Sequence, residues 1–182
     1  MKTLPIEYLH EALSYDPDSG LMRWKERPRH HFASDRGWRC FNSRFAGKPA
    51  GTVSPSTGYV VVNFNGSLFG VHRVAVAMST GEWPPLVDHV DGSRSSNRLE
   101  NLRVCSKSQN LCNRGKQANN TSGFKGVTEH QPGRWRARIN LERQYHHLGV
   151  FPTAEAAHHA YEVAASHLHG RFANAGQPGE RN

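Results

Sequence analysis

Residues 86–113 constrain the fold of this chain more than any other segment. Residues 86–89 and 102–104 each have the apolar character of a short strand, and the stretch between them is rich in Ser, Asn and Arg. Ser106 is followed three residues later by Gln109, a capping-box pattern that predicts the start of a helix. The segment therefore contains, in order, a strand, a polar loop, a second strand and a helix. This order predicts an α+β fold with a small ββα unit.

The residues before this segment predict one helix, one turn and a long loop. Apolar residues near helical spacing predict a helix over 4–14. Turn chemistry at 16–20 leads into a short strand at 21–24. Residues 25–55 carry many Arg, His, Gly and Ser and little periodicity. We therefore expect an exposed basic loop there, one that orders on a ligand.

A β-hairpin is the clearest local signal in the N-terminal half. Residues 59–64 and 67–71 are rich in strand-forming side chains and flank Asn65-Gly66, a dipeptide typical of tight hairpin turns. A helix is expected over 72–80, ending at Gly81.

The C-terminal part has a pattern of its own. Residues 114–122 are polar and indicate a linker. Three antiparallel strands and one helix are then expected, at residues 126–129, 134–141, 144–151 and 153–168. Thr153 is the expected N-cap, and small or apolar side chains recur on one helix face. The tail from residue 175 is Gly/Pro-rich and polar, which predicts disorder.

Charge and composition limit the class of partner. The formal net charge is +8 and the pI is about 9.8. A positively charged surface favours binding to nucleic acid or to an anionic membrane. No basic amphipathic helix stands out, and no apolar run approaches the roughly 18 residues of a membrane span, so nucleic acid is the expected partner. Three cysteines without a C-x-x-C pair argue against disulfides and a zinc ribbon. Without a signal-peptide pattern, we expect a soluble, intracellular protein.

Asp88, His89 and Asn110 have the chemistry that phosphodiester hydrolysis needs. The reaction requires a base that deprotonates water and a cation that neutralises the leaving oxygen. Histidine accepts a proton at physiological pH, and carboxylate and amide oxygens are ligands for Mg²⁺ or Mn²⁺. Neighbouring strand residues point to opposite faces, so Asp88 and His89 serve one site only where the strand ends or bends.

Several spaced elements surround these residues: 87–92, 97–103 and 106–110, with His72-Arg73 before them and 15–20 and Gly58-Tyr59 further upstream. Together they resemble the HNH endonuclease motif, in the form found in phage and intron-encoded homing enzymes. The resemblance implies a ββα-metal fold that binds one divalent ion, Mg²⁺ or Mn²⁺. It implies His89 as general base, Asp88 and Asn110 as metal ligands, and Asn101 as the residue that pins the loop. We expect Asp91 to support the loop turn and His72 to pack or contact phosphate.

The second expected strand of the C-terminal part alternates arginine with apolar residues, which sends the two sets to opposite faces. The apolar set is expected to pack on the helix, leaving an arginine row on the open face, where β-structure can enter the major groove. Residues 123–127, 135–137, 148–151, 154–165 and 172–174 resemble the Apetala/ethylene-response-factor DNA-binding domain. The predicted DNA contacts are Lys125, His130, Arg134, Arg136, Arg138, Tyr145 and His147, with Arg103, Lys107 and Arg114 before them.

These patterns together predict a metal-dependent, sequence-directed DNA endonuclease of the HNH homing type, from a phage or an intron. The expected layout is an N-terminal region and nuclease over 1–113, a linker over 114–122, a DNA-binding domain over 123–174 and a disordered tail over 175–182. One active site per chain predicts a monomer that nicks double-stranded DNA in the cytoplasm of a bacterial or phage-infected cell. A DNA-binding regulator with a degenerate nuclease domain is the main alternative, and an RNA-directed nuclease is the second.

Overall fold

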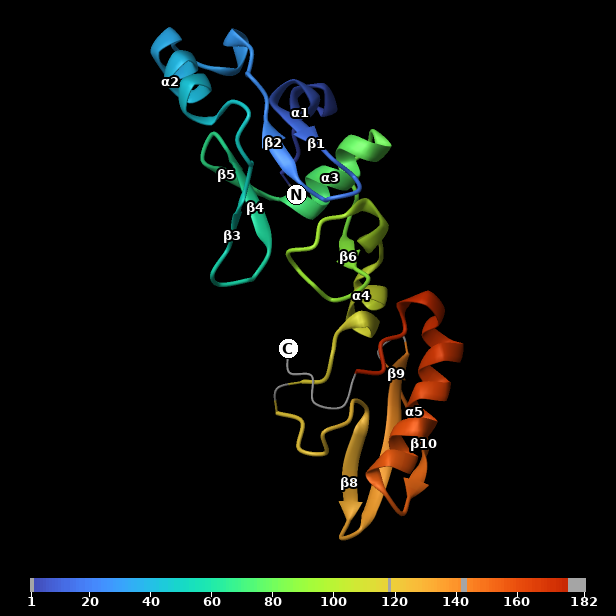
Figure 1. The fold of residues 1–182 in the computed structure, drawn as a ribbon. Coiled ribbons are helices and arrows are strands. Elements are labelled where there is room, and N and C mark those ends of the chain that lie inside the picture. Colours follow the sequence, from blue (N-terminus) through green and yellow to red (C-terminus); the bar gives the residue numbers. More distant parts are fainter. Residues whose placement is uncertain (1, 118, 142–143, 177–182) are drawn as a thin grey trace. The chain divides into compact units, whose positions relative to one another are not determined.

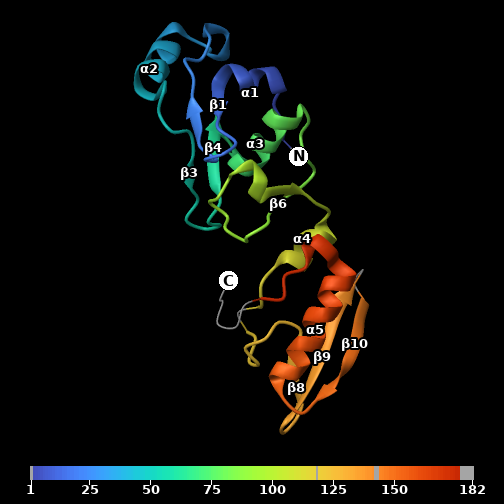
Figure 2. The ribbon, with the colours of Figure 1, turned by 45° about the vertical axis from the view of Figure 1, so that its right-hand side comes forward.

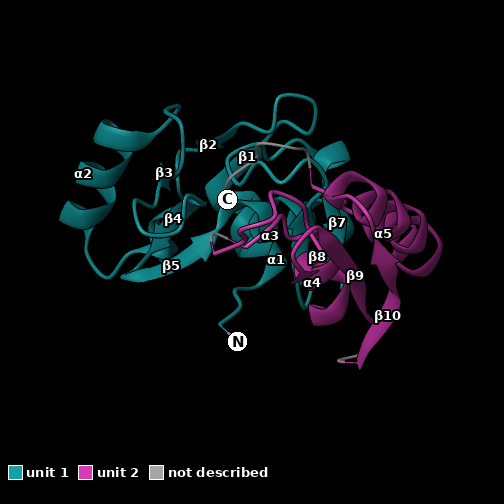
Figure 3. Cartoon of the chain, turned by 90° about the horizontal axis from the view of Figure 1, so that it is seen from below, with its two compact units in different colours: residues 1–105 teal, residues 106–182 magenta. Residues whose placement is uncertain are grey.

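The computed structural model describes residues 2–117, 119–141 and 144–176. The chain divides into two compact units, residues 1–105 and 106–182, which Figure 3 shows in different colours. Both mix helices with antiparallel strands, in agreement with the predicted α+β class.

Unit 1 contains most of the short elements labelled in Figure 1. In chain order they are α1 (Ile6–Ala12), β1 (Leu13–Tyr15), β2 (Met22–Trp24), η1 (Arg29–His31), α2 (Asp35–Phe45), β3 (Thr52–Val53), β4 (Val60–Phe64), β5 (Ser67–Gly70), α3 (Val71–Thr80), β6 (Val87–His89), η2 (Leu99–Asn101) and β7 (Leu102–Val104). The strands form three small antiparallel sheets, β1-β2, β3-β4-β5 and β6-β7. Helix α3 lies at the centre of the core: Val74, Ala75 and Ala77 are fully buried, as are Leu9 and Leu13.

The predicted hairpin and the helix after it are confirmed. Asn65 and Gly66 both have positive φ, at 50° and 79°, which the two-residue turn between β4 and β5 requires. Helix α3 follows β5 directly and ends at Gly81, which adopts the left-handed conformation and donates its N–H to the Ala77 carbonyl.

The predicted loop over residues 25–55 is wrong, because η1, α2 and β3 lie within it. Ser34 caps α2 by accepting a hydrogen bond from the Gly37 N–H. Phe41 and Phe45 lie one turn apart on the helix and pack against the unit 1 core. The exposed face of α2 carries arginines. Because of this polar composition the segment was predicted to be a loop, although two aromatic residues pack the helix against the core.

The predicted helix over 4–14 is too long. Helix α1 ends at Ala12, and Leu13 begins β1. The register of β1 on β2 pairs Leu13 with Trp24 and Tyr15 with Met22. Cross-strand pairing of these residues outweighs the helical spacing that Leu13 shares with the residues before it.

Unit 2 contains α4 (Lys107–Asn113), β8 (Val127–Gln131), β9 (Arg134–Leu141), β10 (Gln144–Phe151), α5 (Ala154–His169) and η3 (Gly170–Phe172). The strands form one antiparallel sheet, as predicted, and the structure gives their order as β10-β9-β8. Figures 1 and 2 both show α5 running along this sheet. Ala157, Tyr161 and Ala165 of α5 are buried together with Val127 and Ile139 of the sheet. The predicted disorder over 175–182 falls mostly on residues 177–182, which lie outside the described residues.

Helix α4 belongs to unit 2, one helix earlier than the predicted boundary after Asn113. Its last carbonyls are bound within that unit. The Lys125 ammonium donates to the Cys112 carbonyl at 2.7 Å, and the Asn174 amide donates to the Asn113 carbonyl at 2.9 Å. The predicted domain layout therefore remains a hypothesis at this boundary.

Candidate functional site

The β6-β7 pair holds Asp88 in an ion pair. Asp88 lies directly opposite Arg103 in the register. The Arg103 guanidinium donates through Nε at 3.0 Å and Nη2 at 2.7 Å to the Asp88 Oδ2. Only 7% of Asp88 is exposed. A buried carboxylate keeps its charge only beside a compensating cation, and Arg103 supplies that charge.

His89 is the last residue of β6 and is 3% exposed. Burial lowers the pKa of His89, while the hydrogen bond to Asn97 and the charges of Asp91 and Asp88 act in the opposite direction. The ring is therefore neutral at physiological pH, which is the state a general base needs. Its Nε2 lies 3.3 Å from the Asn97 Oδ1. Asn97 was not among the residues predicted for the site.

His72 and Tyr59 pack around the His89 ring. The centroid of the His72 ring lies 5.2 Å from that of His89 and 4.9 Å from that of Tyr59. Burial, together with the charges of His89 and Arg73, lowers the pKa of His72 to about 4. Among the described residues, the buried His72 Nδ1 has no hydrogen-bond partner. A neutral ring among aromatic neighbours fits the packing role expected for His72.

Asn101 closes the loop between β6 and β7. Its Oδ1 accepts from the Asp91 N–H at 3.1 Å, and its Nδ2 donates to the Asp91 Oδ1 and to the Ser96 carbonyl, both at 2.9 Å. Asp91 Oδ1 also accepts from the Ser93 N–H at 2.7 Å. Gly92 follows with φ +75°, a conformation that favours glycine. Two of the three supporting residues predicted from the sequence, Asp91 and Asn101, are thus bonded to each other.

Asn110 lies on α4 and is half-buried. The helix begins with the predicted capping box. Ser106 Oγ accepts from the Gln109 N–H at 3.2 Å, and Gln109 Oε1 accepts from the Ser106 N–H at 2.8 Å. Lys107 and Arg114, at the two ends of this helix, are exposed.

The unit 2 sheet carries the predicted arginine row on one face. Strand residues that pair directly share a face, and Arg138 pairs with His147. The Arg138 guanidinium lies 4.8 Å from the centre of the Tyr145 ring, which is exposed. Arg134 is also exposed, and Arg136 is half-buried between them. On the opposite face, Ala137 and Ile139 are buried towards α5, and His130 lies exposed at a bulge in β8.

The placement of Lys125 favours a structural role over the predicted DNA contact. Its ammonium donates to the backbone carbonyls of Cys112 at 2.7 Å and Asn174 at 2.6 Å. Burial lowers the pKa of Lys125 to about 8. The side chain connects α4 and Asn174 to the start of the sheet, and two of the three ammonium donors are used in these bonds.

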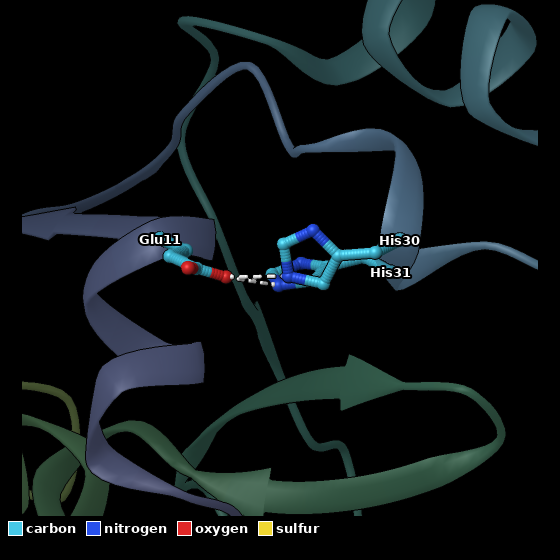
Figure 4. Close-up of side chains that lie close together, drawn as sticks. All are labelled: Glu11, His30 and His31. Atoms are coloured by element: carbon cyan, nitrogen blue, oxygen red, sulfur yellow. Dashed lines mark hydrogen bonds and ion pairs between the residues drawn. The ribbon is translucent and has the colours of Figure 1, made fainter.

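Glu11, His30 and His31 form a cluster with metal-ligand chemistry, shown in Figure 4. The Glu11 carboxylate, on α1, lies 3.0 Å from the His30 Nε2 and 2.7 Å from the His31 Nε2, both on η1. However, the Arg27 Nε donates to the His31 Nδ1 at 3.3 Å. A neutral His31 must then carry its proton on Nε2, the atom that a metal would need. The arrangement fits a hydrogen-bonded chain from Arg27 through His31 to Glu11 better than a metal site.

Comparison with known proteins gives the family. Residues 69–112 match the family model of HNH endonucleases. The chain is 31% identical over 88 residues to Protein 3.8 of Escherichia phage T7, covering 48% of this chain and 72% of that protein. The chain belongs to the HNH endonuclease family. An uncharacterized HNH endonuclease of Acanthamoeba polyphaga mimivirus is 31% identical over 87 residues, 48% of this HNH chain and 44% of the viral protein.

A second group of relatives consists of plant proteins. APETALA2-like protein 2 of rice (Oryza sativa subsp. indica) is 45% identical over 58 residues, and the ethylene-responsive transcription factor ERF084 of Arabidopsis thaliana is 46% identical over 57. These matches cover 31% and 30% of the HNH chain, but only 13% and 22% of the plant proteins. The similarity is partial and weakly suggests a further DNA-binding domain. Within the part of the chain that the structure describes, no helix is long and apolar enough to cross a membrane.

Proposed function

We propose that this HNH protein is a metal-dependent, sequence-directed DNA endonuclease of the homing type. The observation that carries the proposal is the state of His89. It is a buried, neutral imidazole that follows Asp88 on β6, at the end of a short strand pair whose loop Asn101 closes. All these residues lie within the segment that matches the HNH model. HNH nucleases generally use a divalent metal ion.

The donor set fits such an ion. We propose that Asp88 and Asn110 hold Mg²⁺ or Mn²⁺, because a carboxylate and an amide oxygen are the hard ligands that both ions prefer. When bound, the ion neutralises charge on the scissile phosphate and on the departing 3′ oxygen. His89 takes a proton from the attacking water. The expected products are a 5′ phosphate and a 3′ hydroxyl.

The second unit is proposed to supply affinity for the target. Its arginine row, Tyr145 and His147 offer charge and an aromatic surface on one sheet face, and His130 lies exposed at the bulge in β8. Lys107 and Arg114, which are exposed, would add phosphate contacts before the sheet. Arg103 was also predicted to contact DNA, but its guanidinium is about nine-tenths buried and is paired with Asp88. We retain the predicted layout of a nuclease domain, a linker over 114–122 and a DNA-binding domain over 123–174. With one active site per chain, a monomer nicks one strand.

Plasmid cleavage tests the proposal. Supercoiled DNA that carries phage or bacterial sequence should be nicked by the wild-type chain in Mg²⁺ and not in EDTA. His89→Ala and Asp88→Asn should abolish nicking while DNA binding stays within a few-fold. His10→Ala is the matched control, because His10 is an exposed histidine on α1 to which no role in cutting or binding is assigned.

The same experiment decides between the alternatives. A chain that shifts DNA in a gel but never cuts it would be a regulator with a degenerate nuclease domain. Competition with duplex RNA separates a DNA enzyme from an RNA-directed one. Normal cutting by His89→Ala would overturn the assignment of the base.

A further inference from the structure

The hydrogen bonds of the Asn97 side chain determine which way its amide group points. Asn97 is 4% exposed and follows the polar part of the loop between β6 and β7. Its Nδ2 donates to the Ser95 carbonyl at 3.2 Å. A carbonyl oxygen only accepts hydrogen bonds, so the nitrogen of the amide must face Ser95. The Oδ1 is then the atom that faces His89, at 3.3 Å from Nε2.

This orientation determines where the His89 ring carries its proton. An amide oxygen also only accepts, so the bond to Asn97 requires a hydrogen on the His89 Nε2. A neutral imidazole has a single N–H, and its basic lone pair is then on Nδ1. We propose that Asn97 is a positioning residue that selects the Nε2–H tautomer of His89 and so makes Nδ1 the atom that accepts the proton of water. The catalytic consequence rests on the proposed nuclease function, but the tautomer itself does not.

Residues far away in the sequence hold Asn97 in place. The Tyr15 hydroxyl donates to the Asn97 carbonyl at 2.8 Å. Burial raises the pKa of Tyr15 to about 12, so the hydroxyl keeps the proton that it donates. The Leu99 N–H donates to the Pro17 carbonyl at 2.9 Å. The end of β1 and the turn that follows it are thus bonded to Asn97 itself and to Leu99, two residues later.

Gly20 shows how closely this turn approaches the loop. Its φ is +73°, and a Cβ at this position would lie 2.5 Å from the Arg98 nitrogen and from the Asn97 carbonyl carbon. Only a residue without a side chain allows this contact. Residues 15–20, which the nuclease chemistry does not use directly, thereby gain a role: they support the residue that orients the base.

A purely structural role for Asn97 is the competing explanation. Asn101 has such a role, since it bonds to Asp91 and Ser96 of the same loop. Asn97 differs because its oxygen contacts the imidazole and only its nitrogen contacts the loop backbone. The two functions of the amide can therefore be separated by substitution.

The tautomer can be measured directly. In the full chain labelled with ¹⁵N-histidine at pH 8 without added metal, long-range ¹H–¹⁵N correlation spectra distinguish Nε2–H from Nδ1–H rings. We expect His89, assigned by its loss in His89→Ala, to be the Nε2–H tautomer. His31 is an internal reference, because the bond from Arg27 to its Nδ1 requires the same tautomer. A wild-type His89 that is mainly Nδ1–H would overturn the proposal without any variant.

Two substitutions separate the acceptor from the loop contact. Asn97→Asp keeps an oxygen that accepts from His89 but loses the donor to Ser95, so His89 should stay Nε2–H. Asn97→Ala removes both and should give a mixture of tautomers, with His31 unchanged. In nicking assays, kcat should fall roughly 10- to 100-fold in Asn97→Ala, with KM little changed and most of the rate restored in Asn97→Asp.

The outcomes distinguish this inference from the proposed function. An unchanged tautomer in Asn97→Ala, or equal loss of rate in the two variants with the tautomer retained, would leave Asn97 with a loop role only and overturn the inference. If Asn97→Ala does not fold, the wild-type and Asn97→Asp spectra still decide. If the spectra agree with the inference but His89→Ala cuts DNA normally, the tautomer assignment stands and the proposed function fails.

Discussion

Asp88 and Arg103 pair directly across β6 and β7, and two nitrogens of the arginine converge on one carboxylate oxygen. Both side chains are about nine-tenths buried. The Asp88 carboxylate, which is proposed to bind a divalent metal ion, is thus already paired with the positive charge of Arg103. In this environment, the loss of either charge leaves the other without compensation.

Arg103→Gln should therefore destabilise unit 1. Removing one member of a buried ion pair costs about 3 kcal/mol or more, because Asp88 then lacks its compensating charge. Urea unfolding followed by tryptophan fluorescence should show this loss in EDTA. Mg²⁺ should restore part of it, since a cation at Asp88 replaces the missing charge. Stability equal to that of the wild type in EDTA would show that the pair contributes little. Arg98→Gln, in an exposed ion pair, is the matched control.

His72 should make the protein less stable in mild acid. Its folded pKa of about 4 is below the ordinary 6.5, so the unfolded chain binds the proton first as the pH falls. The free energy of unfolding has its full value above pH 6.5. Below that pH, the His72 shift lowers it by up to about 3 kcal/mol as the pH falls towards 4. Replacement of His72 by Phe should flatten the pH dependence of the free energy of unfolding in that window. An unchanged slope in His72→Phe would contradict the lowered pKa, and His10→Ala should leave the slope as it is.

Local signals in the sequence predicted much of this fold because each acts over a few residues. The Asn65-Gly66 turn, the Gly81 helix end and the Ser106 capping box all depend on the backbone preferences of one or two residues. The arginine row on β9 was predictable for the same reason, since alternation alone assigns side chains to faces.

Contacts between distant segments could not be predicted in this way. Nothing in the loop around Asn97 indicates that Tyr15 donates to its carbonyl. The sequence predicted that His72 packs or contacts phosphate, but not that its ring packs on the His89 ring. Helix α2 did have a signal, the spacing of Phe41 and Phe45, but the many polar residues around it outweighed that signal. Such long-range contacts hold the candidate base in place.

Arg136 and Arg138 should control the salt dependence of DNA binding. Each phosphate contact that is lost lowers the slope of log K against log salt by about 0.9. Arg136→Gln and Arg138→Gln should each lower the slope by about this amount. The slope would be measured by fluorescence anisotropy on a duplex at several salt concentrations. A slope that neither substitution changes would exclude this face of the sheet from the DNA interface.

In contrast to the two arginine substitutions, Lys125→Met should lower the stability of the protein and leave the salt dependence of DNA binding unchanged. Its ammonium is bonded to two backbone carbonyls inside unit 2, which lose their donor in this variant. The loss should cost about 1–3 kcal/mol of unfolding free energy, while the salt slope of DNA binding stays at the wild-type value. Calorimetry and anisotropy on the same preparation check both parts. A reduced slope with unchanged stability would restore Lys125 to the DNA contacts.

Arg27→Lys should be one of the more damaging conservative changes in unit 1. Arg27 is 2% exposed, and its guanidinium lies 4.5 Å from the Phe32 ring centre and 4.7 Å from that of Phe41. It also donates to the Tyr8 hydroxyl and to the His31 Nδ1. A lysine ammonium cannot stack on two rings and donate in both directions, so we expect a loss of about 2 kcal/mol. Arg44→Lys is the matched control, because Arg44 lies over the single ring of Phe45 at the surface. Equal stability of the two variants in thermal unfolding would show that the planar group at residue 27 is dispensable.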